Sequence, residues 1–171
     1  MGTATTAPKS VVQVGRDKRA RASAPDHFSK DALIALRFAA SEATRAGHSE
    51  TWTSDLLIGM LRSDRGYGPR ILKALGIRLD DLRDRVPGAP PGANEPVCMP
   101  RRVSRVQVAV RHAREEAGRA PAGEIGTIDL LIGLLEEGEG VAATVLHTSG
   151  VDLEAVRAAI GEIERSGTEE E

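Results

Sequence analysis

The sequence predicts an all-α fold, a tandem pseudo-twofold duplication of a four-helix unit with about eight helices in total. The first observation is a short segment that occurs twice: residues 55–61 read Asp-Leu-Leu-Ile-Gly-Met-Leu, and residues 129–135 read Asp-Leu-Leu-Ile-Gly-Leu-Leu. The second is that this offset of 74 residues holds without a gap on both sides of the segment. The third is an apolar periodicity of three and four residues, without the two-residue alternation of a strand. Identical pairs at the offset are Arg37 and Arg111, Glu42 and Glu116, Thr53 and Thr127, Gly66 and Gly140, Leu72 and Leu146, and Gly76 and Gly150.

The helical pattern of the first copy begins at Phe28, where the first of its helices is expected. This helix carries an apolar stripe that would face the core. Thr53 or Ser54 is expected to cap the second helix, with Asp55 in its first turn, where a carboxylate suits the positive end of the helix dipole. The stripe on the first helix consists of Ala32, Leu33, Leu36, Ala39, Ala40 and Ala43.

The remaining helices follow from the same signals. Pro69 suits the first turn of a third helix, which ends at Gly76, and Leu79, Leu82 and Val86 mark a short fourth. The second copy repeats this order, and its helices are expected at about residues 103–117, 127–137, 140–149 and 152–165.

Three segments are expected to lie outside the helical body. The amino-terminal segment lacks periodicity and is rich in Lys and Arg, while a Pro- and Gly-rich stretch separates the two copies. The expected division is a flexible basic arm at 1–27, a double-repeat domain at 28–165 and an acidic tail at 166–171, with repeat one at 28–86, a linker at 87–100 and repeat two at 101–165.

Gly59 and Gly133 lie at equivalent places inside apolar helices, where Gly costs about 1 kcal/mol relative to Ala. Close packing of a second helix against each glycine would offset that cost. The repeated segment is therefore interpreted as a buried core helix in each copy.

Composition argues against several classes of protein. The chain has 171 residues, with 23 Lys and Arg against 25 Asp and Glu, so nucleic acid is not the expected partner. Cys98 is the only cysteine, which rules out a disulfide within the chain. No apolar run approaches the roughly 20 residues that span a bilayer, and no secretory segment follows Met1, so we expect a cytoplasmic protein without a membrane anchor.

Neither a metal, a cofactor nor a catalytic site is expected. The four histidines, His27, His48, His112 and His147, are scattered, with no His-Glu-x-x-His motif and no cysteine pair. A Gly-x-Ser-x-Gly nucleophile elbow is also absent. The sequence therefore favours a protein that is not an enzyme.

Both copies carry motifs of a known family. The first copy contains Thr53-Ser54-Asp55-Leu56-Leu57-Ile58-Gly59-Met60-Leu61, and the second contains Ile125-Gly126-Thr127, followed by Glu137-Gly138-Glu139-Gly140-Val141-Ala142-Ala143. These motifs resemble the amino-terminal domain of the Clp (Hsp100) unfoldases, above all the ClpC type. That domain is a pair of four-helix repeats, and the resemblance covers about residues 28–165. Unfoldases also carry AAA+ nucleotide-binding modules, but no Gly-x-x-x-x-Gly-Lys-Ser/Thr occurs in this sequence. We therefore expect a stand-alone domain without motor activity.

The resemblance also implies a ligand site. ClpC-type repeats receive adaptors, substrates and phosphoarginine-marked proteins, and a Glu after the Thr at the start of each repeat's second helix contacts the modified side chain. A helix amino terminus offers free N–H groups to a phosphate. Ser54 and Ile128 hold the two Glu positions in this chain, so we expect weak phosphoarginine binding unless Asp55 or Asp129 replaces them. The candidate partner-binding residues are Trp52, Thr53, Ser54, Asp55, Gly126, Thr127, Ile128 and Asp129.

Trp52 has two interpretations. It could anchor a partner, because Trp is frequent at binding hot spots, or it could cover the edge of the core. The leading functional hypothesis is a binding module for the peptides, adaptor proteins, clients or peptide-like small molecules of a Clp unfoldase, acting as an accessory or a sequestering decoy. The alternative is a nucleic-acid-associated regulator that uses Arg16, Lys18, Arg19 and Arg21 of the basic arm.

Overall fold

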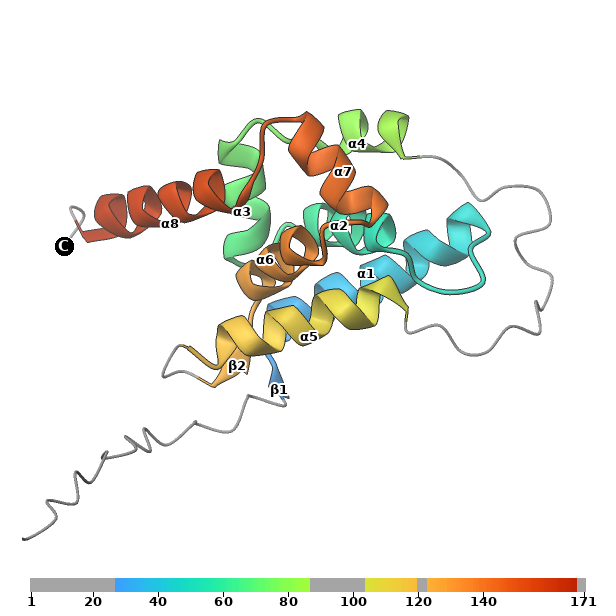
Figure 1. Cartoon of the computed structure of the whole chain (residues 1–171), viewed down its shortest axis with the longest axis horizontal. Coiled ribbons are helices and arrows are strands. Elements are labelled where there is room, and N and C mark those ends of the chain that lie inside the picture. The colour runs from blue at the N-terminus through green and yellow to red at the C-terminus, as the bar shows by residue number, and fades with distance from the viewer. Residues whose placement is uncertain (1–26, 87–103, 120–122, 169–171) are drawn as a thin grey trace, which may run out of the picture.

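A computed structural model describes residues 27–86, 104–119 and 123–168, which form eight helices and two very short strands (Figure 1). The predicted linker and all of the predicted basic arm except His27 lie outside these ranges. None of the described helices is long and apolar enough to cross a bilayer. The first repeat contains α1 (Lys30–Ala46), α2 (Thr53–Ser63), α3 (Tyr67–Ala74) and α4 (Leu79–Arg85), and the second contains α5 (Arg105–Ala117), α6 (Thr127–Glu137), α7 (Val141–Thr148) and α8 (Leu153–Thr168).

The helix bounds repeat at the offset found in the sequence. Shifting α2 and α3 by 74 residues gives the bounds of α6 and α7, and the same shift carries the start of α4 to the start of α8. The predicted all-α duplication is therefore confirmed. The last helix of the second repeat is longer than its counterpart, with 16 residues in α8 against 7 in α4.

The structure adds one short strand pair that the all-α prediction did not include. His27 and Phe28 form β1, which pairs in parallel with β2 (Glu124–Ile125), and the Ser29 N–H then donates to the Ile125 carbonyl at 3.0 Å. Two paired residues are too few to leave a period-two pattern in the sequence. The first helix consequently begins at Lys30 instead of Phe28, with Ser29 as its cap.

The predicted cap of α2 is also wrong. Trp52 occupies the cap position, and the Asp55 carboxylate accepts a hydrogen bond from the Trp52 N–H at 2.8 Å. The same contact recurs in the second repeat, where Asp129 accepts from the Gly126 N–H at 2.7 Å. Thr53 is instead the first helical residue, and its hydroxyl accepts a hydrogen bond from the Ala142 N–H of another helix.

The core lies where α2 and α6 cross α1 and α5. A Cβ atom on Gly59 would lie 2.4 Å from the Ala39 nitrogen, and one on Gly133 would lie 2.1 Å from the Ala109 carbonyl oxygen. Both distances are far below van der Waals contact, so only Gly permits this approach of the helices. The expected close packing at the two glycines is thus observed, and it makes α2 and α6 the buried centre of the fold (Figure 1).

Candidate functional site

The predicted site residues fall into two groups, one at the start of α2 and one at the start of α6. The two groups are linked across the repeats by their threonines. Thr53 Oγ1 accepts a hydrogen bond from the Ala142 N–H in the first turn of α7 at 3.3 Å, and Thr127 Oγ1 accepts one from the Gly68 N–H in the first turn of α3 at 3.0 Å. Both threonines are buried, so their hydroxyls fix the assembly of the repeats.

Ser54 and Asp55 lie in the interior. Ser54 is fully buried, and its Oγ has no hydrogen-bond partner among the described residues. Asp55 is 1% exposed, and its Oδ2 lies 2.8 Å from His48 Nδ1 as well as accepting from the Trp52 N–H. The Asp55 carboxylate therefore holds the loop that precedes α2, and it does not face solvent.

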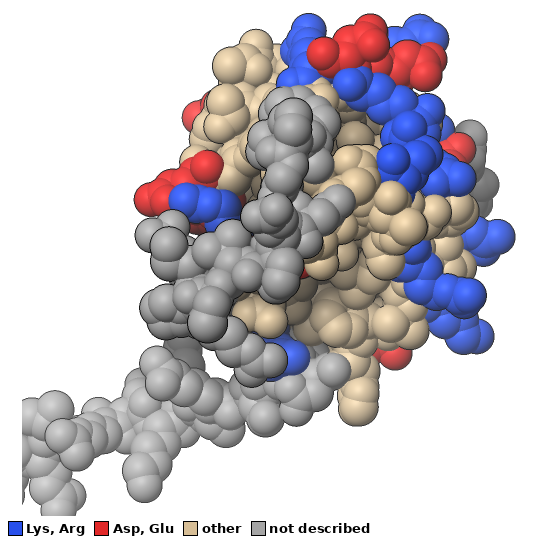
Figure 2. All heavy atoms as spheres, turned by 90° about the vertical axis from the view of Figure 1, so that its right-hand side faces the viewer, with Lys and Arg blue, Asp and Glu red and all other residues tan. Residues whose placement is uncertain are grey.

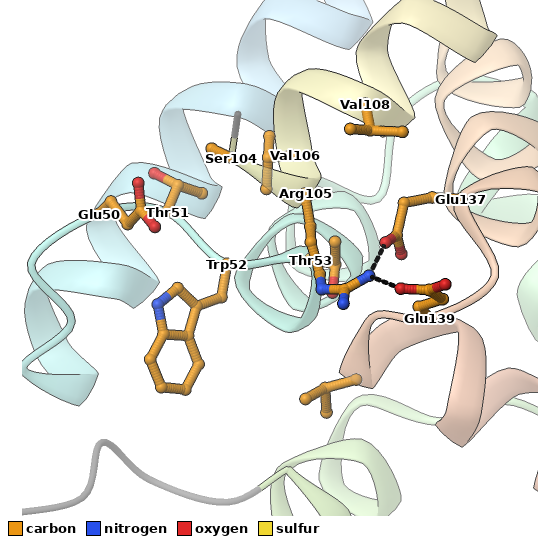
Figure 3. Close-up of a pocket in the computed structure, with 11 residues that line it drawn as sticks. Glu50, Thr51, Trp52, Thr53, Ser104, Arg105, Val106, Val108, Glu137 and Glu139 are labelled. Atoms are coloured by element: carbon orange, nitrogen blue, oxygen red, sulfur yellow. Dashed lines mark hydrogen bonds and ion pairs between the residues drawn. The ribbon is translucent and has the colours of Figure 1, made fainter. Parts of the chain in front are cut away.

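His48 positions Trp52. The two rings stack with centroids 3.8 Å apart and an interplanar angle of 14°, and the His48 side chain is wholly buried beneath the indole. Trp52 also lines a surface cavity (Figure 3). Sequence reasoning left His48 among the scattered histidines, although it precedes Asp55 by seven residues.

The cavity beside Trp52 has a volume of about 630 Å³. It lies between the loop before α2, the start of α5, the end of α6 and the start of α7 (Figure 3). Only Trp52 and Thr53 among the predicted site residues line it. The other lining residues are Glu50, Thr51, Ser104, Arg105, Val106, Val108, Glu137, Glu139 and Val141.

One arginine and two glutamates form the polar wall of this cavity. Arg105 pairs with Glu137 at 2.6 Å and with Glu139 at 2.9 Å (Figure 3). The hydrogen bonds that Arg105 donates to these two carboxylates raise the pKa of its guanidinium. The Glu137 carboxylate also accepts a hydrogen bond from the Gly140 N–H at 2.7 Å, which holds this side chain against the start of α7. With Glu50 on the opposite rim, the lining carries more negative than positive charge.

The start of α6 offers different groups. Trp52 is replaced there by Gly126, and Val141 of the cavity is matched by Tyr67, which is 54% exposed. Ile128 is half-buried against the core. Burial raises the pKa of the Asp129 carboxyl, although hydrogen bonds from the Gly126 N–H and from its own N–H act in the opposite direction. The two helix starts are therefore related by the duplication but differ in chemistry.

No group of three or more His, Cys, Asp and Glu side chains in the described ranges is arranged to hold a metal ion. The cavity wall instead presents a buried carboxylate, an exposed guanidinium and three valines beside an indole. Such a lining suits non-covalent recognition of a side chain that combines apolar and charged parts.

Comparison with known proteins agrees with this architecture. The family model described as "Clp repeat (R) N-terminal domain" matches residues 27–93 and 103–171. The chain belongs to this family. A ClpA homologue of Cyanidium caldarium, described as an ATP-dependent Clp protease ATP-binding subunit, is 36% identical over 140 residues, and the chloroplastic chaperone protein ClpC2 of Oryza sativa is 35% identical over 150. These alignments cover 79% and 83% of this chain but only 16% of each relative.

Solved structures share the fold of this Clp N-type domain. The amino-terminal domain of ClpD from Arabidopsis thaliana superposes with a TM-score of 0.61 at 22% identity, covering 84% of this chain and 98% of that one. The Hsp104 amino-terminal domain from Candida albicans gives the same TM-score at 13% identity, with 81% and 92% covered. The fold implied by the sequence resemblance is thereby confirmed.

Proposed function

We propose that this Clp N-type domain is a non-catalytic module of the cytoplasm that binds peptide segments of the adaptors or clients of a Clp unfoldase. Membership of the family supports the class of partner. The observation that carries the proposal is the cavity of about 630 Å³ beside Trp52, at the start of α2, where the resemblance implies a ligand site. The second helix start, with Gly126, Thr127, Ile128 and Asp129, is a further candidate contact.

The cavity lining favours one kind of segment. Trp52, Val106, Val108 and Val141 offer an apolar wall for an aliphatic or aromatic side chain. Glu50 and Glu139 leave negative charge at the rim, which would attract Lys or Arg. A segment with an apolar residue next to a basic one therefore fits this site best.

A fluorescence titration tests binding at this site, because Trp52 is the only tryptophan of the chain. A short peptide with Leu beside Arg should change the emission of Trp52 in a saturable way, while the same peptide with Glu in place of Arg should bind more weakly. Substituting Val141→Arg should abolish binding by filling the apolar wall and adding a repelling charge. The matched control is Tyr67→Arg, which places the same residue at the equivalent position of repeat one and should leave binding unchanged.

The accessory and decoy modes predict opposite effects on proteolysis. An accessory added to a reconstituted Clp unfoldase and protease should raise the degradation rate of a client, and a sequestering decoy in excess should lower it. Either effect should be lost with Val141→Arg and kept with Tyr67→Arg. A protein that changes neither the degradation rate nor the Trp52 emission would refute the proposed function.

A further inference from the structure

A cluster of arginines occupies a second surface, where α1, α2 and α4 meet. Arg45, Arg62 and Arg83 converge on Glu42, at N–O distances of 2.6, 2.6 and 3.5 Å. Figure 2 views the molecule from the side of α4 and the carboxyl end of α1, and Lys and Arg side chains gather along one edge of that face. We call the cluster of Arg45, Arg62 and Arg83 the arginine surface.

The arginine surface carries excess positive charge. Glu42 is 1% exposed and supplies one negative charge to three guanidinium groups. Burial alone would raise the pKa of the Glu42 carboxyl, but hydrogen bonds from Arg45 and Arg62 outweigh it and the pKa is lowered, so the carboxylate stays ionised. Within the described ranges these arginines form ion pairs with Glu42 alone, and the aspartates of α4 are not among their partners.

The guanidinium groups remain open to solvent. The exposed fraction of the side chain is 59% for Arg45 and 37% for both Arg62 and Arg83. Each guanidinium has five N–H donors, and the two oxygens of one carboxylate cannot satisfy three such groups. Donors are therefore left for the carboxylates of a partner.

An apolar depression borders the arginine surface. The Arg62 guanidinium lies over the Phe38 ring, 4.9 Å from its centroid. Phe38 also lines a depression of about 330 Å³ on the outer face of α1, together with Ile34, Arg37 and Ser41. Positive charge and apolar surface thus lie side by side.

The second repeat does not carry this arrangement. The residue equivalent to Phe38 is His112, and the one equivalent to Arg62 is Glu136, and these two lie 3.4 Å apart. Repeat two keeps Arg119, Arg157 and Glu116 at the positions of Arg45, Arg83 and Glu42, but Glu136 replaces the third arginine, so the three-arginine cluster is specific to repeat one. It is not a requirement of the repeat fold, which the second copy builds without it.

We propose that the arginine surface, with Ile34 and Phe38 beside it, docks an acidic polypeptide segment that carries an apolar side chain. The excess positive charge selects carboxylates, and the depression on α1 accepts the apolar group. The surface shares no residue with the cavity beside Trp52, so this inference goes beyond the proposed function and adds a second partner site.

Binding of a synthetic peptide tests the proposal. The probe is a short fluorescent peptide of Glu and Asp residues around one Leu, added to the full chain. The test variant is Arg45→Gln/Arg83→Gln, which keeps Arg62 as the partner of Glu42. The matched control is Arg119→Gln/Arg157→Gln, the equivalent pair in repeat two, which removes the same charge. We expect affinity to fall about ten-fold or more in the test variant, to stay unchanged in the control and to weaken with added salt in the wild type.

A map of the contact complements the affinities and does not depend on the variants. Amide chemical shifts of the wild type should change on α1 and α4 when the peptide is added, and not around Trp52. The proposal is overturned if the shifts change only around Trp52, if both double variants weaken binding equally, or if the peptide fails to bind at millimolar concentration. Tighter binding of a DNA oligonucleotide of equal charge would assign the surface to nucleic acid and overturn it as well.

Discussion

Thr53 and Thr127 stand 74 residues apart, and each caps the first turn of a helix in the opposite repeat. The exchange ties the duplicated halves together, in addition to the apolar core that they share. Each hydroxyl satisfies a backbone N–H that would otherwise be buried without a partner. Gly66 and Gly140 leave room for these hydroxyls, since a Cβ on either glycine would lie within 2.5 Å of a threonine Oγ1.

Replacing either threonine should destabilise the protein. Thr53→Val and Thr127→Val keep the shape of the side chain but remove the acceptor, so each leaves a buried N–H unpaired at a cost of about 1–3 kcal/mol. Urea denaturation followed by circular dichroism measures the free energy of unfolding. The control is Thr44→Val, whose exposed hydroxyl bonds only to the Ala40 carbonyl and should cost about 0.5 kcal/mol or less. Equal losses at Thr44 and Thr53 would contradict the linking role.

Adding one methyl group at the helix crossings should be costly. Gly59→Ala and Gly133→Ala each drive a Cβ into backbone atoms of the neighbouring helix, and we expect a loss of about 3 kcal/mol or more in the free energy of unfolding. Gly161→Ala in α8 is the control, because nothing lies within 4 Å of its added Cβ. That substitution should stabilise the protein by up to about 1 kcal/mol, owing to the higher helix propensity of Ala. Thermal melts of the three variants separate the two effects.

The helices and their duplication could be predicted because both rest on local patterns. Apolar spacing marks the buried faces of the helices. Gly is unfavourable inside a helix, so Gly59 and Gly133 indicated that another helix packs closely against each of them. The cap of α2 was predicted wrongly for an equally clear reason. Thr53 has the chemistry of a cap, but its hydroxyl bonds to α7, which is distant in sequence.

The candidate site was only partly predictable. Of the candidate residues at the start of α2, Trp52 and Thr53 line the cavity, while Ser54 and Asp55 are buried in the core. Which residues at the start of α2 are buried depends on how that helix packs against its neighbours, and a sequence motif does not reveal this packing. Arg105 and Glu137 reach the cavity from α5 and α6, whose meeting point depends on the complete fold.

The ionised state of Glu42 should make stability depend on pH. Its pKa is lowered in the folded protein from an ordinary value of 4.5. The stability that the ionised carboxylate contributes is therefore complete above pH 4.5 and is lost as the pH falls through the lower folded pKa. Glu42→Gln should flatten the acid limb of a plot of unfolding free energy against pH. Glu124→Gln, at an exposed position in β2, is the control. An unchanged acid limb in Glu42→Gln would show that the arginines do not stabilise this carboxylate.

Asp129 should act in the opposite sense. Burial raises its pKa above an ordinary value of 3.8, so the folded state holds the proton more tightly than the unfolded state does. Stability therefore falls as the pH rises from the ordinary pKa to the higher folded pKa. Asp129→Asn keeps an oxygen that can accept the Gly126 N–H but removes the charge. We expect the variant to lose this fall in stability, measured by denaturation at a series of pH values. A steeper fall in the variant would contradict the assignment.

Phosphoarginine binding should be weak in this chain. The resemblance implies a Glu at positions 54 and 128, and each missing charge-assisted hydrogen bond would lower affinity by about ten-fold or more. Restoring a carboxylate is practicable at only one of them. Ser54 is fully buried, so Ser54→Glu would place a charge in the core, whereas Ile128 is half-buried at the surface.

Calorimetric titration of phosphoarginine into Ile128→Glu therefore decides the matter. The affinity should rise about ten-fold over the wild type, because the new carboxylate would meet the guanidinium while the start of α6 faces the phosphate. Ile128→Gln is the matched control, since it adds a side chain of the same shape without the charge and should give little gain. Tight binding by the unmodified protein would instead favour Asp129 as the partner of the guanidinium, because Asp129 is half-buried whereas Asp55 is 1% exposed.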